Sequence, residues 1–146
     1  MKAVVQRVSN ANVKVNEEIV GKIENGFVVL LGVQNGDTKE NADYLVKKIT
    51  ALRVFSDEND KMNLSLKDVN GSLLVVSQFT LCADCVKGNR PSFSGAADPK
   101  VANELYEYFV SECRKLDFKV ETGIFGANMK LNLTNDGPVT IILEKY

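Results

Sequence analysis

The stretch Leu73-Leu74-Val75-Val76-Ser77-Gln78-Phe79-Thr80-Leu81 changes character halfway along its length. Its aliphatic first half predicts a strand, over 73–81, that is buried in a sheet. Ser77, Gln78 and Thr80 then place polar groups where this strand leaves the core, which is a common way to build a functional site. In the alternative interpretation, Ser77 and Thr80 are simply β-favouring residues of an edge strand. Residues 82–97 carry two glycines and a proline, which predicts a long loop of the kind that serves function.

Two amphipathic helices are predicted, one before this strand and one after the loop. The first begins at Asp37, which has the spacing of a capping box with Glu40. The second begins with Asp98 as its N-cap and Pro99 at its first helical position. Apolar residues follow at steps of three and four, at Ala42, Leu45, Ile49 and Leu52 in the first helix and at Ala102, Leu105, Phe109, Cys113 and Leu116 in the second. We expect both apolar stripes to face a sheet.

Segments rich in valine, isoleucine and leucine supply the strands of that sheet. We expect further strands at residues 1–9, 11–15, 19–23, 27–31, 53–55, 118–121, 129–133 and 139–143. Turns are expected at 16–18 and 134–138, and a loop at 56–63. The run 27–31 is apolar throughout, which suits a strand that is buried on both faces. With the two helices, these strands predict a single α+β domain over residues 1–146, with a mixed, mostly antiparallel sheet.

Composition limits the class of protein. The chain has 146 residues, and one domain of that length buries enough surface to be stable without metals or disulfides. Its net charge is −1, which excludes a broad basic surface, so any contact with RNA should be small and local. The longest apolar run, Phe27–Val33, is far too short to cross a bilayer. The first residues lack the apolar core of a signal peptide, so we expect a cytoplasmic protein without membrane contact.

The chain contains no histidine. This excludes a Ser-His-Asp triad, a Cys-His pair and any histidine-ligated metal site, and we expect no metal and no cofactor. The three cysteines are expected to be thiols in a reducing compartment. Cys82 and Cys85 have a CxxC spacing, but a thioredoxin-type pair opens a helix, and a zinc site needs further strong ligands. Cys113 lies on the apolar stripe of its helix and is expected in the core.

A second unusual segment is Asn135-Asp136-Gly137-Pro138-Val139-Thr140. On its own it is typical of a hairpin turn, because Asp-Gly and Gly-Pro are ordinary turn chemistry. Together with Ser77-Gln78-Phe79-Thr80-Leu81, however, it resembles the two signature motifs of the D-aminoacyl-tRNA deacylase family. Other segments similar to the family are Val5-Gln6-Arg7-Val8, Ala11-Asn12-Val13, 87–93 and 123–129. The resemblance covers residues 1–146, and the pair Cys82 and Cys85 is its one departure.

The resemblance implies a homodimer whose active site is shared between the subunits. The catalytic residues implied, at the pocket floor of one subunit, are Ser77, Gln78, Phe79 and Thr80. The substrate-binding residues implied are Gly137, Pro138, Met129 and Arg7. In the family the Gly-Pro peptide of the other subunit is cis and directs two carbonyl oxygens at the substrate. Such carbonyls would hold the α-amino group and leave no room for an L side chain, whereas glycine, which has no side chain, would pass.

The implied reaction suits a protein without histidine. An aminoacyl ester is already activated and has a vicinal hydroxyl, so the enzyme need only position water or that hydroxyl and stabilise the oxyanion. We expect the backbone N–H groups near Phe79 and Thr80 to bind the carbonyl oxygen, and Gln78 with Ser77 to position the ribose. Thr80 as a covalent nucleophile has no visible base and is the weaker alternative.

The loop after the signature strand offers a contact for the RNA. Lys87 and Arg90 are the candidates for phosphate contacts with the 3′ end of the aminoacyl-tRNA. Two other classes of function stay open at this point. One is a non-catalytic RNA-binding or dimerisation module, which would retain aminoacyl-tRNA without turnover. The other is a thiol oxidoreductase that uses Cys82 and Cys85.

Overall fold

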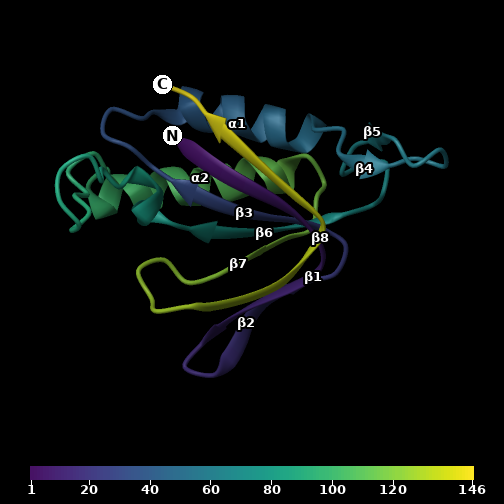
Figure 1. Cartoon of the computed structure of the whole chain (residues 1–146), viewed down its shortest axis with the longest axis horizontal. Coiled ribbons are helices and arrows are strands. Elements are labelled where there is room, and N and C mark those ends of the chain that lie inside the picture. The colour runs from purple at the N-terminus through teal and green to yellow at the C-terminus, as the bar shows by residue number, and fades with distance from the viewer.

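One long strand, β1 (Lys2–Val15), organises the sheet in this computed structural model of residues 1–146 (Figure 1). The strand order is β2-β1-β3-β6-β7, and β8 pairs with β1 along the remaining edge. Only β3 with β6 and β6 with β7 run parallel, so the predicted mixed, mostly antiparallel sheet is confirmed. The other strands span Glu18–Ile23 (β2), Gly26–Gly32 (β3), Ser72–Ser77 (β6), Val120–Thr122 (β7) and Lys130–Glu144 (β8).

Both helices, α1 (Lys39–Ala51) and α2 (Pro99–Lys115), cover the same face of the sheet (Figure 1). The main core lies between them and that face, and its largest fully buried side chains include Phe27, Leu31, Leu45, Ile49, Leu73 and Phe109. A smaller core lies on the opposite face, where β2 comes over β6 and β7. Leu73 and Val75 face the helices, and Leu74 and Val76 face the smaller core. β6 is therefore buried on both faces, which fixes the position of its carboxyl end.

The helix starts show one correct and one wrong prediction. Asp98 caps α2 as predicted, because its Oδ1 accepts a hydrogen bond from Lys100 N at 2.9 Å. The cap of α1 is Thr38 and not Asp37, since Asn41 Oδ1 accepts from Thr38 N at 2.9 Å. Asp37 instead holds the Met1 ammonium group at 2.8 Å.

Leu116 departs from the predicted stripe of α2. It follows the last helical residue as the C-cap, and 46% of it is exposed. Neither helix is long and apolar enough to cross a membrane.

Several predicted strands and loops need correction, among them the strand 53–55, of which only Phe55 is in β4 (Phe55–Ser56). Residues 1–9 and 11–15 form one strand, and the predicted loop 56–63 contains a small hairpin of β4 and β5 (Met62–Leu64). β7 begins at Val120 and not at 118.

Residues 134–138 do not turn, because β8 continues through them. β1 offers backbone partners on both sides of this segment, so the chain stays paired and bulges instead of reversing. Gln6 pairs with Thr140 and Val8 with Asn135, which leaves residues 136–139 as the bulge. The hairpin interpretation of this segment is therefore wrong.

Candidate active site

The first signature segment turns away from the sheet at the carboxyl end of β6. Ser77 is the last residue of the strand and pairs with Leu31, and Gln78 N donates to Leu31 O at 2.8 Å. The chain then forms a 3-10 helix, η1 (Phe79–Cys82), and not the predicted continuation of the strand to Leu81. The signature side chains are thus presented at the sheet edge by one tight turn.

A glycine in the neighbouring strand makes room for this turn. Gly32 ends β3, and a Cβ there would approach Leu81 Cβ to 3.0 Å and Gln78 O to 3.1 Å. Any side chain at position 32 would push η1 away from the sheet. The position of η1 is therefore set by backbone packing as well as by its own residues.

A cavity of about 680 Å³ opens beside this turn. Its walls come from the end of β6, the loop before α2, the first turn of α2 and the segment 125–131. Most of the lining is apolar, and the polar exceptions are Ser77, Gln78, Asp98 and Asn128. Asp98 is the only titratable residue of the lining, and its Oδ1 is occupied as the cap of α2. The lining therefore contains no imidazole, and its one carboxylate serves as the cap of α2.

The backbone at the start of η1 supplies hydrogen-bond donors. The first N–H groups of a helix have no partner within it, and neither Phe79 N nor Thr80 N donates to a carbonyl in the turns and loops. Both residues are exposed, Phe79 by 56%. The Thr80 hydroxyl accepts a short hydrogen bond from Gln78 Nε2. The arrangement can stabilise a developing oxyanion and leaves Thr80 without a partner that could remove its proton.

Aromatic pairs stiffen the cavity walls. The rings of Phe79 and Phe93 lie edge to face, with centroids 5.0 Å apart. Phe125 packs against Tyr106, with centroids 6.1 Å apart. The Tyr106 hydroxyl donates to Val75 O at 2.8 Å, and burial raises the pKa of Tyr106 to about 12, so this donor stays protonated. Tyr106 thereby connects the Phe125 wall of the cavity to β6.

The second signature segment lies elsewhere on the molecule. Gly137 and Pro138 are exposed on the bulge of β8, and the peptide bond between them is cis. The Arg7 guanidinium fixes this bulge, because Nε donates to Asp136 O at 2.9 Å and Nη1 donates to Val54 O at 2.6 Å. Gly137 has a φ of +131°, a value that favours glycine, and its bulge projects into solvent.

Within one chain, the structure therefore brings together only part of the predicted site. Cavity-lining residues among those predicted are Ser77, Gln78, Phe79 and Met129. Thr80 lies on the same turn but outside the lining, and Arg7, Gly137 and Pro138 do not line the cavity.

The lining residues that were not predicted as site residues include Phe93, Ala102, Phe125 and Asn128. Phe93 and Phe125 could have been found from the sequence, because they are aromatic residues in glycine-containing loops. Ala102 could not, because it is indistinguishable from a core position of its helix.

The cysteines are all free. Cys82 ends η1, is 7% exposed, and has its pKa raised by burial, while Cys85 is exposed in the loop that follows. Cys113 is buried in the main core, and this burial raises its pKa to about 12. Because the thiolate is the reactive form, and because Cys82 closes a helix instead of opening one, the thiol oxidoreductase alternative is disfavoured.

Lys87 and Arg90 lie at the tip of the loop after η1. Reciprocal hydrogen bonds close the base of this tip, from Asp84 N to Ser92 O at 2.8 Å and from Ser92 N to Asp84 O at 2.9 Å. Both cations are exposed, and neither forms a salt bridge.

Comparison with known proteins adds a second line of evidence. Residues 4–144 match the family model described as D-Tyr-tRNA(Tyr) deacylase. The D-aminoacyl-tRNA deacylase of Thermosipho africanus is 60% identical over 144 residues, which cover 99% of this chain and 97% of that protein. The D-aminoacyl-tRNA deacylase of Clostridioides difficile is 57% identical over 144 residues, with the same two coverages.

Two solved structures share the architecture. One, described as a c-Myc DNA unwinding element binding protein, superposes with a TM-score of 0.94 at 43% identity and covers 100% of this chain and 99% of its own. The other, described as a probable eukaryotic D-amino acid tRNA deacylase, has a TM-score of 0.84 at 18% identity and covers 97% of both chains. At that identity the second likeness shows the fold alone.

Proposed function

The chain belongs to the D-Tyr-tRNA(Tyr) deacylase family and hydrolyses D-aminoacyl-tRNA, and from this premise we propose how the cavity at the end of β6 performs the reaction. The observation that carries the proposal is the turn of η1, which presents the first signature segment beside an apolar cavity whose one titratable residue, Asp98, caps α2. An activated ester needs little more than orientation and oxyanion stabilisation, so this geometry is sufficient for its hydrolysis.

The first part of the proposal assigns roles to the signature residues. The N–H groups of Phe79 and Thr80 bind the carbonyl oxygen of the ester, where negative charge develops in the transition state. Ser77 and Gln78 position the ribose, and the attacking group is water or the vicinal hydroxyl of that ribose. Thr80 holds Gln78 in place through the hydrogen bond between their side chains and is not a nucleophile.

The second part of the proposal is that two copies share each site. A row of apolar side chains crosses the sheet on the face away from the helices, through the paired residues Ile142, Val4, Leu30 and Val76. Ile142 is 66% exposed at one end of this row, and Val76 lines the cavity at the other. A second copy seated on this face covers Ile142 and carries its own exposed bulge toward the cavity. The dimer thus combines Ser77–Thr80 of one subunit with Gly137 and Pro138 of the other.

The third part of the proposal concerns chirality. Main-chain carbonyls of Gly137 and Pro138 accept hydrogen bonds from the α-amino group of the substrate and occupy the space that an L side chain needs. D-aminoacyl and glycyl esters therefore enter, and L-aminoacyl esters are excluded. Arg7 acts through the bulge, which it holds by the Asp136 carbonyl, while Met129 forms part of the cavity wall.

The RNA part of the substrate is held by few contacts. Lys87 and Arg90 bind phosphates of the 3′ strand, since they are exposed on the loop that borders the cavity. Because aminoacyl-tRNA is the substrate of cytoplasmic translation, we assign the enzyme to the cytoplasm.

Hydrolysis of matched D- and L-tyrosyl-tRNA, with the molecular mass measured by light scattering in the same buffer, tests these proposals. We expect a dimer that hydrolyses the D form and spares the L form. An active monomer would rule out the shared site, and equal hydrolysis of both forms would rule out the chiral filter.

The same experiment addresses a non-catalytic nucleic-acid-binding module, the alternative raised by the name of the DNA unwinding element binding protein. That alternative predicts retention of tRNA without release of amino acid. The net charge of −1 argues against broad binding of a nucleic-acid backbone.

A further inference from the structure

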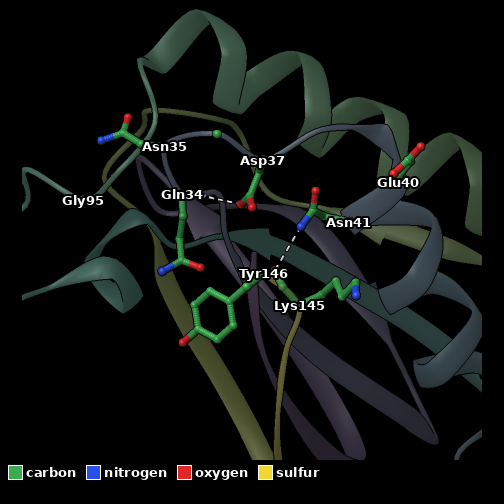
Figure 2. A pocket seen from close by; sticks show the side chains of 9 residues that line it. Gln34, Asn35, Asp37, Glu40, Asn41, Gly95, Lys145 and Tyr146 are labelled. Carbon is green, nitrogen blue, oxygen red and sulfur yellow. Dashed lines mark hydrogen bonds between the residues drawn. The ribbon is translucent and has the colours of Figure 1, made fainter.

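The segment 92–97 carries Phe93 into the wall of the cavity at the end of β6 and is fixed to the chain that follows β3. Asn35 N donates to Gly95 O at 3.0 Å, and Asn35 Nδ2 donates to Ser94 O at 2.8 Å. Asn35 and Gly95 lie beside each other at the edge of a neighbouring polar pocket (Figure 2), and neither lines the cavity at the end of β6. The position of the segment is therefore set from outside that cavity.

Val33 joins this segment to η1. Its carbonyl oxygen accepts hydrogen bonds from Ala97 N at 3.0 Å and from Cys82 Sγ at 3.5 Å. Cys82 is the last residue of η1 and is buried. The end of η1 and the segment 92–97 are therefore fixed to the same point of the chain after β3.

Phe79, at the start of η1, has less support. Its side chain is 56% exposed and belongs to neither hydrophobic core. Its one aromatic contact is the edge-to-face pair with Phe93, in which the ring planes are 68° apart and the centroids 5.0 Å apart. Phe93 is half-buried and also lies outside both cores. Because aromatic pairs of this geometry contribute more than their buried area alone, Phe93 restrains the Phe79 side chain.

We propose that Phe93 is a positioning residue for the hydrolysis of D-aminoacyl-tRNA and acts through Phe79. This role rests on the proposed function, in which the N–H groups of Phe79 and Thr80 bind the ester carbonyl. With the end of η1 fixed at Cys82 and its start held by Phe93, both N–H groups keep one direction relative to the cavity. Displaced donors stabilise the transition state less, so loss of the Phe93 ring should slow the chemical step and leave binding of the tRNA unchanged.

Single-turnover hydrolysis of D-tyrosyl-tRNA, with the protein in excess, separates the chemical step from binding. Phe93→Leu keeps the apolar bulk but removes the ring, and we expect it to lower the maximal rate constant about fivefold. The protein concentration that gives half of the maximal rate should stay the same. Phe93→Tyr, which keeps the ring, should retain the rate. Asn35→Ala, which loosens the segment from outside the cavity, should lower the rate constant by a smaller factor.

Two further variants test whether Phe93 acts through Phe79. Phe79→Leu should lower the maximal rate constant, and adding Phe93→Leu to it should cause no further loss, because the contact is already gone. The matched control is Phe118→Leu, which removes a half-buried ring packed against the main core near the start of β6, at the opposite end from the cavity. This control should lower the unfolding temperature and leave the rate unchanged.

Two kinetic outcomes would overturn the positioning role and leave the deacylase activity standing. One is a double variant in which the separate losses multiply, since Phe93 would then not act through Phe79. The other is Phe93→Leu with an unchanged maximal rate and a raised half-saturating concentration, since Phe93 would then only bind the substrate.

An inactive wild-type protein would instead overturn the function proposed for the cavity. The effect of Phe93 on η1 is then measured by NMR from the amide resonances of Phe79 and Thr80. These resonances should shift in Phe93→Leu and stay in place in Phe118→Leu. Resonances that do not move in Phe93→Leu would overturn the positioning role whether or not the protein is active.

Discussion

The end of β6 and the bulge of β8 carry the two signature segments, yet they are built in opposite ways. Residues 77–82 fold over a cavity of their own chain, and their hydrogen bonds are to neighbours within a few residues or to the adjacent strand. The bulge at 136–139 is held by Arg7, which lies about 130 positions earlier in the sequence, and its residues 136–138 are exposed while Val139 is buried in the main core. The first segment is a complete wall within one chain. The second segment exposes Gly137 and Pro138, which line no part of the cavity of their own chain.

The largest expected effect comes from removing the glycine of the bulge. In Gly137→Ala, the new Cβ would approach Val139 N to 3.0 Å and Val139 Cγ2 to 2.8 Å, at a φ that side chains rarely adopt. The displaced carbonyls should lower kcat/KM on D-tyrosyl-tRNA about a hundredfold, as misplacement by an ångström does elsewhere.

The control for this variant is Gly36→Ala, at a position that also has a positive φ but whose added Cβ meets no atom within 4 Å. The control carries backbone strain alone, so its unfolding temperature should fall less than that of Gly137→Ala, which adds the close contacts with Val139. If Gly36→Ala lost as much activity as Gly137→Ala, strain alone and not the bulge would explain the loss.

A smaller effect, and one that depends on concentration, is expected at the exposed end of the apolar row. Ile142→Glu places a charge where the proposed second copy would cover it, so the dimer should dissociate at least about tenfold more readily. Activity per chain should fall at nanomolar protein and recover as the concentration rises. Activity that is reduced equally at every concentration would contradict the shared site. Analytical ultracentrifugation of the same samples gives the fraction of dimer.

Thr80→Ala should have a still smaller effect and should separate rate from chirality. Loss of the hydroxyl frees the Gln78 side chain and should lower kcat on D-tyrosyl-tRNA about tenfold, the value of one hydrogen bond. The ratio of D to L hydrolysis should stay unchanged, because the hydroxyl is not part of the proposed filter. A tyrosyl group covalently attached to Thr80 in the wild-type protein, detected by mass spectrometry, would show instead that Thr80 is the nucleophile.

The smallest perturbation is alkylation of the thiols. With iodoacetamide at pH 8, Cys85 should react and Cys82 should remain protected, since burial raises the pKa of Cys82 and keeps it in the unreactive thiol form. Cys113 should also be protected, because its pKa of about 12 lies far above the pH of the reaction. Peptide mapping identifies the modified residues. If Cys82 reacted as fast as Cys85, η1 would open in solution and would not be a rigid wall of the cavity.

Local sequence patterns predicted the structure correctly where it depends only on residues that are close in the sequence. Asp98 and Pro99 mark the start of α2 correctly, because a cap and a first-turn proline act within a few residues. The same kind of reasoning chose Asp37 over Thr38 for α1, since both spacings are reasonable and only tertiary contact with Met1 decides between them. The turn of η1 was not predicted for a related reason. The room for it depends on Gly32, which belongs to another strand.

Long-range pairing explains the errors at the second signature segment. Asn135-Asp136-Gly137-Pro138 has every local feature of a hairpin turn, yet β1 is long enough to pair with residues on both sides of it. The candidate site shows the same division. Ser77, Gln78, Phe79 and Met129 meet at one cavity as predicted, while Phe93, Ala102 and Phe125 join them only through the packing of α2 and two loops.

The outward projection of the β8 bulge also has a genetic consequence. If each site takes its turn from one subunit and its bulge from the other, a chain damaged at Ser77–Thr80 and a chain damaged at Gly137 can complement each other. A mixed dimer then contains one intact site and one doubly damaged site. Random reassortment of equal amounts of the two inactive proteins should restore about a quarter of the wild-type sites. Two defective alleles expressed together would therefore support proofreading that neither supports alone.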